Sequence, residues 1–342
     1  MSRRSLALAA GLAAIVLLVR APASGQAATA AVKPKASSGA WTPPRTSDGK
    51  PDLQGVWSSA TLTPLERSKG LGAKEFYTDE EFSELLKRAR QGEFGPEADI
   101  GRAAPQAVRF DLSLYGLDLT KVGFASSKRT SLIVGPEGSV PPMLPEARKR
   151  NAERAARLKG HEYDSYRERP LAERCVVMPQ ERIPLETGPD ADQNLLQIVQ
   201  GTGYVALLHE QNHQTRIIPT DGRTHIPQNI RQYQGDSVGH WEGDTLVIDT
   251  TNFTDLTPFR GSGPKLHVVE RFTPTGDGAI MYRFTVEDPE TWDRPWTAEV
   301  PMRKATGPVY EWACHEGNTM ITTILSGARL AEQDAAQKAA AK

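Results

Sequence analysis

The sequence predicts a mainly β protein, an antiparallel barrel or sandwich preceded by an irregular, partly helical N-terminal half. From about residue 175 onward, short runs rich in β-branched and aromatic residues follow one another, separated by turn residues. Residues 280–287, with the sequence IMYRFTVE, alternate apolar and polar side chains throughout. This period of two is typical of a strand with one face in the core and the other in contact with water.

The strands and turns of the C-terminal half follow from this pattern. Two connections, residues 242–244 (EGD) and 275–278 (TGDG), have the composition of tight hairpin turns, because Asp and Gly adopt the backbone angles that such turns need. The expected strands are residues 195–200, 204–210, 215–218, 238–241, 245–251, 267–273, 279–287, 298–302 and 310–315.

The N-terminal half contains one well-marked helix, which is expected to begin at Thr78. Thr78 and Glu81 have the spacing of a capping box, in which each side chain bonds the backbone N–H of the other residue. Apolar residues then recur at helical spacing until Gly92, where the helix is expected to end. Further helices are expected at residues 144–159 and 320–342, and short strands near residues 131–134.

Composition divides the chain into five segments. They are an export signal (1–28), a disordered linker (29–40), an irregular and helical region (41–174), a β-barrel domain (175–330) and a polar helical tail (331–342).

The export signal begins with Arg3-Arg4, continues with an apolar stretch over residues 6–19 and ends in small residues suited to cleavage. It is either an ordinary secretory leader or, from the sequence SRRSL at residues 2–6, a twin-arginine leader. No second apolar run reaches the length of a membrane span, so the mature protein is expected in the periplasm or outside the cell.

Charge and cysteine content limit the partners. The 41 basic and 42 acidic residues nearly cancel, which argues against a nucleic-acid partner. The sequence has no Gly-rich phosphate loop after a strand, so a nucleotide cofactor is not expected. The two cysteines, Cys175 and Cys314, are expected to form one disulfide in an oxidising compartment, and the alternative is two buried free thiols.

Residues 209–213, HEQNH, match the H-E-x-x-H string of zinc hydrolases. On a helix, His209 and His213 would bind zinc and Glu210 would act as the general base. The surrounding residues instead favour two strands that flank a polar turn, in which residues four apart lie roughly 13 Å from each other. Zinc therefore remains the alternative, and no cofactor is the preferred prediction.

Several stretches resemble a large family of exported bacterial proteins known mainly from acidobacterial and proteobacterial genomes. The stretches are residues 216–225 (RIIPTDGRTH), 235–253 (GDSVGHWEGDTLVIDTTNF), 266–272 (LHVVERF) and 312–318 (WACHEGN). The likeness covers roughly residues 40–330. It implies export and a lipocalin-like (calycin-like) barrel, and it implies no particular activity.

The segment 216–249 is dense in groups able to do chemistry. His225 and His240 are the candidates for acid–base catalysis, because an imidazole titrates near neutral pH. Asp236 is the candidate supporting carboxylate, and Arg223 is the candidate that stabilises a developing anion. The alternative for many of the charged residues here is turn formation, as in Asp221-Gly222.

The candidate ligand-binding residues are aromatic or cationic and lie in the β-rich half: Trp241, Arg216, Tyr282 and Trp296. A barrel lined by aromatic side chains and a few polar groups suits a small molecule. The alternative is that the aromatic residues fill the core.

Three functions remain open. The first is an exported barrel that binds a small, largely apolar molecule and acts on it by cofactor-free acid–base chemistry, as a lyase, isomerase or hydrolase. The second is a zinc-dependent hydrolase that uses the HEQNH string. The third is a non-catalytic envelope protein that works through partner contacts.

Overall fold

The computed structural model describes residues 41–90, 127–135, 137–177, 183–185, 195–305 and 308–341. The expected export signal and linker lie outside the described residues. The chain divides into two compact units, Met1–Trp41 and Thr42–Lys342. All described helices and strands belong to the second unit, which spans both the predicted N-terminal region and the predicted barrel domain.

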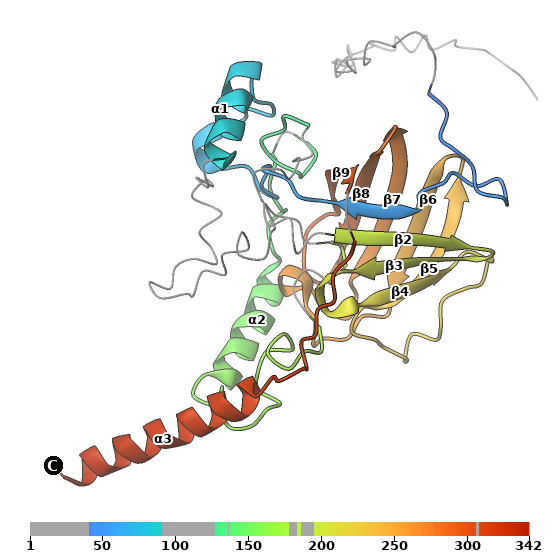
Figure 1. The fold of residues 1–342 in the computed structure, drawn as a ribbon. Coiled ribbons are helices and arrows are strands. Elements are labelled where there is room, and N and C mark those ends of the chain that lie inside the picture. The colour runs from blue at the N-terminus through green and yellow to red at the C-terminus, as the bar shows by residue number, and fades with distance from the viewer. Residues whose placement is uncertain are drawn as a thin grey trace, which may run out of the picture. The chain divides into compact units, whose positions relative to one another are not determined.

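Nine antiparallel strands form one sheet that is nearly closed into a barrel, as predicted (Figure 1). Their order in the sheet is β4-β3-β2-β1-β9-β8-β7-β6-β5. The strands are β1 (Gly55–Ser58), β2 (Leu195–Gly201), β3 (Tyr204–His209), β4 (Thr215–Pro219), β5 (Asp236–Glu242), β6 (Thr245–Thr251), β7 (His267–Gly276), β8 (Ala279–Glu287) and β9 (Trp296–Lys304).

The barrel has two unlike ends. At the hairpin end, short turns join β2 to β3, β5 to β6 and β7 to β8, and the predicted turn residues Gly243 and Gly278 have φ angles of 57° and 66°. At the opposite loop end lie the longer connections, residues 210–214, 252–266 and 288–295. The connection 220–235 runs from the hairpin end, where β4 stops, to the loop end, where β5 starts.

The inward faces of the strands form one core. In β8, Ile280, Tyr282, Phe284 and Val286 are buried and their neighbours are more exposed, as the alternation predicted. Aromatic rings gather in this core, with centroids 4.8 Å apart for Phe272 and Tyr282.

The predicted strands between residues 195 and 302 are all observed, but the strand predicted at 310–315 is wrong. That stretch is irregular, and the backbone N–H groups of Tyr310 and Trp312 face side chains of residues 210 and 213 and not a neighbouring strand. The N–H of Tyr310 donates to Glu210 Oε1 at 2.9 Å, and the N–H of Trp312 lies 3.3 Å from the His213 ring. Near residues 131–134 the structure has an isolated bridge, Ile133 to Ala298, and no extended strand.

The sheet also contains a strand that the sequence pattern missed. β1 lies between β2 and β9, so four residues of the N-terminal region complete the barrel. Trp57 in this strand is buried, and its indole N–H donates to the carbonyl of Leu53 at 2.8 Å.

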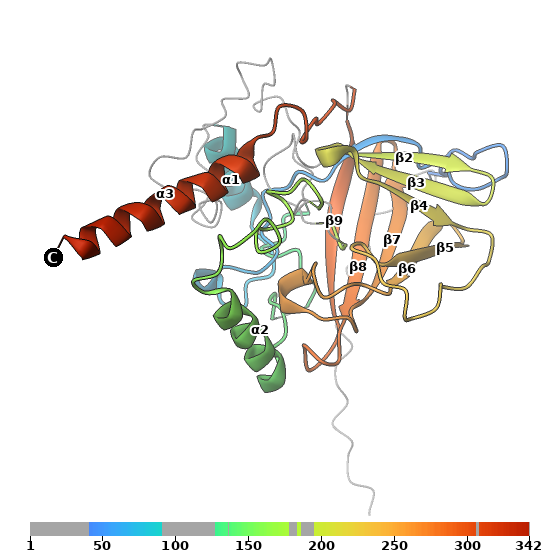
Figure 2. The ribbon, with the colours of Figure 1, turned by 90° about the horizontal axis from the view of Figure 1, so that it is seen from below.

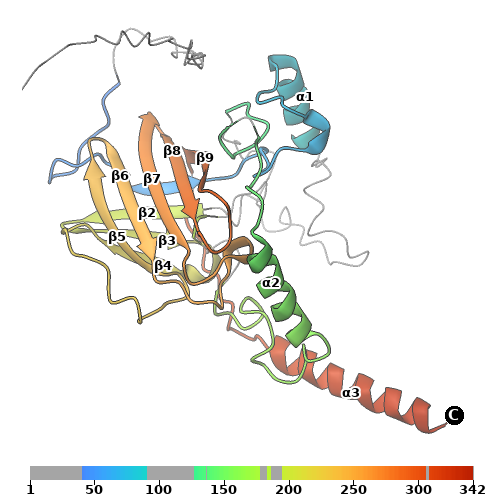
Figure 3. The same ribbon diagram turned by 180° about the vertical axis from the view of Figure 1, so that it is seen from behind.

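Three α-helices accompany the barrel in the described part of the chain: α1 (Asp79–Arg90), α2 (Pro145–Leu158) and α3 (Met320–Ala340). The predicted capping box of α1 is present: the N–H of Thr78 donates to Glu81 Oε2 at 2.8 Å, and the N–H of Glu81 donates to Thr78 Oγ1 at 3.2 Å. α2 lies at the loop end, where Asn151 donates to the carbonyl of Gly261 (Figure 3). None of the described helices is both long enough and apolar enough to span a bilayer.

The predicted disulfide between Cys175 and Cys314 is present. It joins the chain ahead of β2 to the chain beyond β9.

The barrel closes between its two edge strands, β4 and β5, which lie side by side (Figure 2). Side chains hold this seam together. Arg216 of β4 donates to Ser237 Oγ of β5 at 3.0 Å. A Cβ atom on Gly239 would stand only 3.0 Å from the Ile218 side chain, so glycine permits the close approach of the two strands.

Candidate functional site

A buried ion pair crosses the interior of the barrel. Arg216 on β4 and Glu270 on β7 both occupy inward positions of their strands. Arg216 Nη1 and Nη2 donate to Glu270 Oε1 and Oε2 at 3.2 and 2.6 Å, which is the paired geometry that a guanidinium offers a carboxylate. The two side chains are 4% and 0% exposed.

Tyr282 on β8 completes this pair. Its hydroxyl donates to Glu270 Oε1 at 2.9 Å and accepts the backbone N–H of Leu185 at 3.1 Å. Burial, together with the nearby Glu270 carboxylate, raises the pKa of Tyr282 well above its ordinary value. Tyr282 is therefore a neutral hydroxyl.

His209, at the end of β3, also points into the barrel and is 6% exposed. Burial, and secondarily the charge of Arg216, lowers the pKa of His209 to about 3, so its imidazole is neutral. We call Arg216, Glu270, Tyr282 and His209 the inner cluster.

Two nitrogens of the inner cluster, Arg216 Nε and His209 Nε2, are buried and have no hydrogen-bond partner among the described residues. The Arg216 Nε–H can only donate, whereas the role of His209 Nε2 depends on the tautomer. A buried polar group left unsatisfied costs about 1–3 kcal/mol. The inner cluster therefore retains unused hydrogen-bonding capacity.

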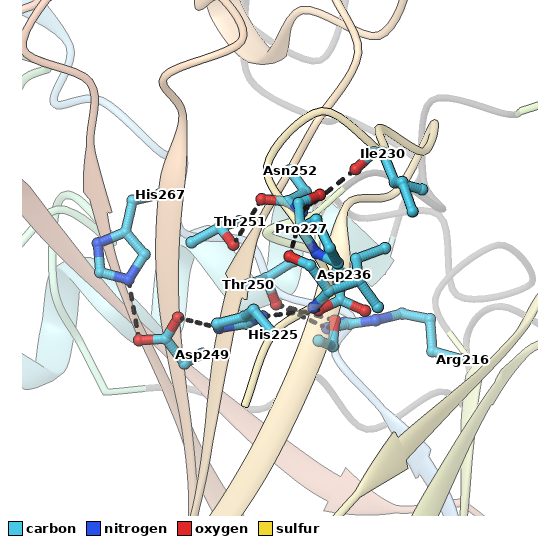
Figure 4. A network of polar contacts seen from close by, with 12 residues as sticks. Arg216, His225, Pro227, Ile230, Asp236, Asp249, Thr250, Thr251, Asn252 and His267 are labelled. Carbon is cyan, nitrogen blue, oxygen red and sulfur yellow. Dashed lines mark hydrogen bonds and ion pairs between the residues drawn. The ribbon is translucent and has the colours of Figure 1, made fainter. Parts of the chain in front are cut away.

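A second cluster lies on the outer face of the same wall (Figure 4). His225 Nδ1 is 2.8 Å from Asp236 Oδ2, and His225 Nε2 is 3.0 Å from Asp249 Oδ1. The other oxygen of Asp249 is 2.9 Å from His267 Nε2. We call His225, Asp236, Asp249 and His267 the outer cluster.

Asp249 is the centre of the outer cluster because it bridges two imidazoles. Burial would raise the pKa of Asp249, but the hydrogen bonds and charges of His267 and His225 outweigh burial and lower it. The hydrogen bond to Asp249 raises the pKa of His267, burial opposes the shift, and Glu287 adds to it from 3.7 Å. An imidazole oriented by a carboxylate is the usual arrangement for proton transfer.

The outer cluster and the neighbouring Asn252 hold the connection 220–235 against the barrel. The N–H of Ile226 donates to Asp236 Oδ2 at 3.1 Å. Asn252 Nδ2 donates to the carbonyls of Ile226, Pro227 and Ile230 at 3.0–3.2 Å (Figure 4). His225 therefore helps to hold the connection 220–235 in place, and it is also a candidate for acid–base catalysis.

Strand alternation places the two clusters on opposite faces. Asp236 and Ser237 are neighbours on β5, and Asp249 and Thr250 are neighbours on β6. Ser237 and Thr250 contact Arg216 on the inside, at 3.0 and 3.4 Å, whereas Asp236 and Asp249 contact His225 on the outside. Arg216, His225 and Asp236 belong to one polar segment of the sequence. The structure places Arg216 inside the barrel and the other two on the outer face.

His240 and Arg223, the remaining predicted catalytic residues, contact neither cluster in the described structure. His240 is exposed and its Nε2 lies 3.1 Å from Glu242 Oε1. Arg223 pairs with Asp221 at 2.6 Å and lowers the pKa of Asp221 to about 2.

The two predicted ligand-binding tryptophans contribute to the core. Trp296 lies among other rings, with centroid distances of 6.0 Å to Phe259 and 5.9 Å to Trp292. Trp241 is partly buried and packs against the same core. This is the packing role that the sequence left open for the aromatic residues.

The HEQNH string does not form an α-helix. β3 ends at His209, and residues Gln211–His213 form a short 3-10 turn with φ angles of 58° at Asn212 and 51° at His213. His209 is buried, His213 is exposed, and Glu210 accepts a backbone N–H, so the helical zinc arrangement is absent. The described residues contain no group of three or more His, Cys, Asp or Glu side chains arranged to hold a metal ion.

A surface cleft of about 300 Å³ lies outside β8 and β9. Arg283, Arg294, Thr297 and the predicted ligand-binding residue Trp296 contribute to its lining. Arg283 and Thr297 occupy outward positions of their strands, so the cleft is separate from the inner cluster.

Sequence reasoning missed Glu270, Asp249, His267 and the inward role of His209. One local signal was present for Glu270. In β7 the inward row reads Val268, Glu270, Phe272, and a carboxylate between two buried apolar residues is unusual enough to indicate a buried partner.

The sequence matches no protein-family model and no curated protein.

Proposed function

We propose that this protein is an exported β-barrel protein that binds a small, largely apolar molecule inside the barrel, where the inner cluster holds the polar group of that molecule. The predicted leader and the disulfide support export. No cofactor is part of the proposal.

The observation that carries the proposal is the pair of unpartnered nitrogens, Arg216 Nε and His209 Nε2. Interiors of barrels normally contain apolar side chains, and buried polar atoms normally have partners. Here an ion pair, a hydroxyl and an imidazole meet in the core with hydrogen-bonding capacity remaining. A bound polar group satisfies that capacity.

The residues around the inner cluster suit an apolar body. Leu207 and Ile218 are the inward neighbours of His209 and Arg216 on their strands, and both are completely buried. Ile183 and Leu185 lie in the same core, 2% and 6% exposed.

The proposal is tested by methyl NMR during titration with N-phenyl-1-naphthylamine, a neutral apolar probe. Binding inside the barrel is expected to shift the methyl signals of Leu207 and Ile218. Ile217 is the internal control, because it precedes Ile218 and is 69% exposed. Shifts confined to exposed methyl groups such as Ile217, or no saturable shift, would contradict the proposal.

The outer cluster favours a second candidate function, cofactor-free acid–base catalysis on the outer face of the barrel. The observation that supports it is the Asp249 carboxylate between two partly exposed imidazoles. In this function His267 transfers the proton, and Asp249 orients its ring. His225 is less available, because carboxylates lie 2.8 and 3.0 Å from its two nitrogens, whereas the Nδ1 of His267 is 3.7 Å from Glu287.

This second function is tested by proton exchange of enolisable ketones in heavy water and by hydrolysis of p-nitrophenyl acetate. His267→Ala is expected to lower an observed rate by about 100-fold, a typical contribution of one acid–base group. The matched control is His240→Ala, which removes an exposed histidine outside the cluster. Equal effects of the two substitutions would rule out the outer cluster as the site.

A further inference from the structure

We infer that the inner cluster selects neutral molecules whose apolar body bears a hydrogen-bond-accepting oxygen, a carbonyl or a hydroxyl, and that it discriminates against carboxylates of the same size. This inference rests on the proposed function and adds the chemical class of the ligand.

The charges of the inner cluster already balance. Arg216 and Glu270 neutralise each other through two hydrogen bonds, at 3.2 and 2.6 Å. His209 and Tyr282 add no charge, because burial keeps the imidazole unprotonated and the hydroxyl protonated. A bound carboxylate would leave a net negative charge beside Glu270, which is completely buried, and uncompensated charge in an interior is strongly unfavourable.

One hydrogen-bonding group that remains unused in the inner cluster, the Arg216 Nε–H, is a donor, so a ligand must supply an acceptor. Both Nη atoms of Arg216 are occupied, and its Nε–H remains as a donor. Tyr282 has already donated to Glu270 and accepted from Leu185. An oxygen at Arg216 Nε satisfies this donor, and His209 Nε2 can donate to an oxygen or accept from a hydroxyl, according to its tautomer. A plain hydrocarbon would leave both nitrogens unsatisfied.

Part of the protein's own chain already brings apolar side chains and one neutral polar group, a donor to Tyr282, to the cluster. The segment 183–185 places two apolar side chains, Ile183 and Leu185, in the core and gives one neutral hydrogen-bonding group to the cluster, the Leu185 N–H. An apolar molecule with one neutral polar group resembles that segment in its chemistry.

The test compares ligands that share a skeleton and differ in the head group. Isothermal titration with 2-acetylnaphthalene, 2-naphthoate and 2-methylnaphthalene forms one set, and 2-decanone, decanoate and decane form a second. At a pH where the carboxylates are ionised, the ketone of at least one set is expected to bind tenfold or more tightly than its carboxylate and its hydrocarbon. A carboxylate that binds as tightly as its ketone overturns the inference and leaves the proposed function intact. Binding of no member of either set overturns both.

Variants assign the preference to the inner cluster. The double substitution Arg216→Met with Glu270→Gln removes the donor without leaving a buried charge, and the ketone is expected to lose its advantage over the hydrocarbon. Arg223→Met, which removes an exposed guanidinium, is the matched control and is expected to change nothing. Arg283→Met addresses the surface cleft: loss of ketone binding in this variant, but not in the double variant, would place the site in the cleft and overturn the inference.

Discussion

Glu270 is a completely buried carboxylate inside the barrel, and the hydrogen bonds of its neighbours offset the cost of burying its charge. Arg216 supplies an opposite charge with two donors, and Tyr282 supplies a third donor at 2.9 Å. Removing one member of such a buried pair leaves an uncompensated charge, whereas removing both members does not.

We expect Arg216→Met and Glu270→Gln, made singly, to lower the free energy of unfolding by about 3–5 kcal/mol each. The double variant should lose much less than the sum, because neither charge remains unpaired. Urea unfolding of the four proteins measures this coupling. Additive losses would show that the two side chains do not act as a pair.

His267 should titrate above the ordinary value of 6.5, because Asp249 favours its protonated form. NMR titration of its ring protons is expected to give a midpoint above that value, and Asp249→Asn should lower the midpoint. Because the folded-state pKa of His267 is raised, its protonation stabilises the folded protein. This contribution to the free energy of unfolding is complete below the unfolded-state pKa of His267 and is lost as the pH rises through its folded-state pKa. An unchanged midpoint in Asp249→Asn would contradict the assignment.

The residues of the two clusters differ in how far the sequence predicts them. His225 and Asp236 lie in one dense polar segment and are 11 positions apart. The composition of that segment alone was therefore enough to identify both as candidate site residues. Asp249 and His267 come from separate strands and meet only through the register of β6 and β7. That register depends on the whole sheet, which a local pattern does not contain.

Among the elements, the connection 220–235 depends on a glycine at its end. Gly235 has a φ angle of 68°, and a Cβ atom there would stand 2.4 Å from the carbonyl oxygen of Thr251. The backbone therefore has no room for a side chain where the connection enters β5.

We expect Gly235→Ala to destabilise the protein by about 2–4 kcal/mol, because a left-handed backbone and a backbone clash act together. Gly243→Ala is the matched control: its φ angle is 57°, but nothing lies within 4 Å of the added atom. In Gly243→Ala, backbone strain at the positive φ angle alone should lower the free energy of unfolding by about 1–2 kcal/mol. Thermal unfolding measures both, and equal losses would show that the clash is relieved locally.

Strands and hairpins were predictable because their signals are local. Alternation in residues 280–287 and the turn at 242–244 need only neighbouring residues to be recognised. β1 was not predictable, because four residues are too few to show a period. The segment 310–315 has strand-like composition, yet its N–H groups find side-chain partners on the 210–213 turn.

At the scale of the whole molecule, the disulfide joins positions 139 residues apart. Replacing Cys175 and Cys314 together by Ser is expected to lower the free energy of unfolding by about 4–5 kcal/mol, mainly by freeing the unfolded chain. Denaturant unfolding measures the loss. Chemical reduction of the unmodified protein should reproduce it, and a loss seen only in the substituted protein would point to packing at Cys175.

The position of β1 has a consequence for the timing of folding. β1 is synthesised early, but its two partners in the sheet are β2 and β9, and β9 ends at Lys304. During synthesis, therefore, β1 and β2 can pair only after a long intervening stretch has emerged, and β1 gains its second partner only when β9 has been made. Until then β1 has an open edge, which invites pairing with other chains. A nascent chain that stops short of β9 therefore leaves one edge of β1 without its partner strand.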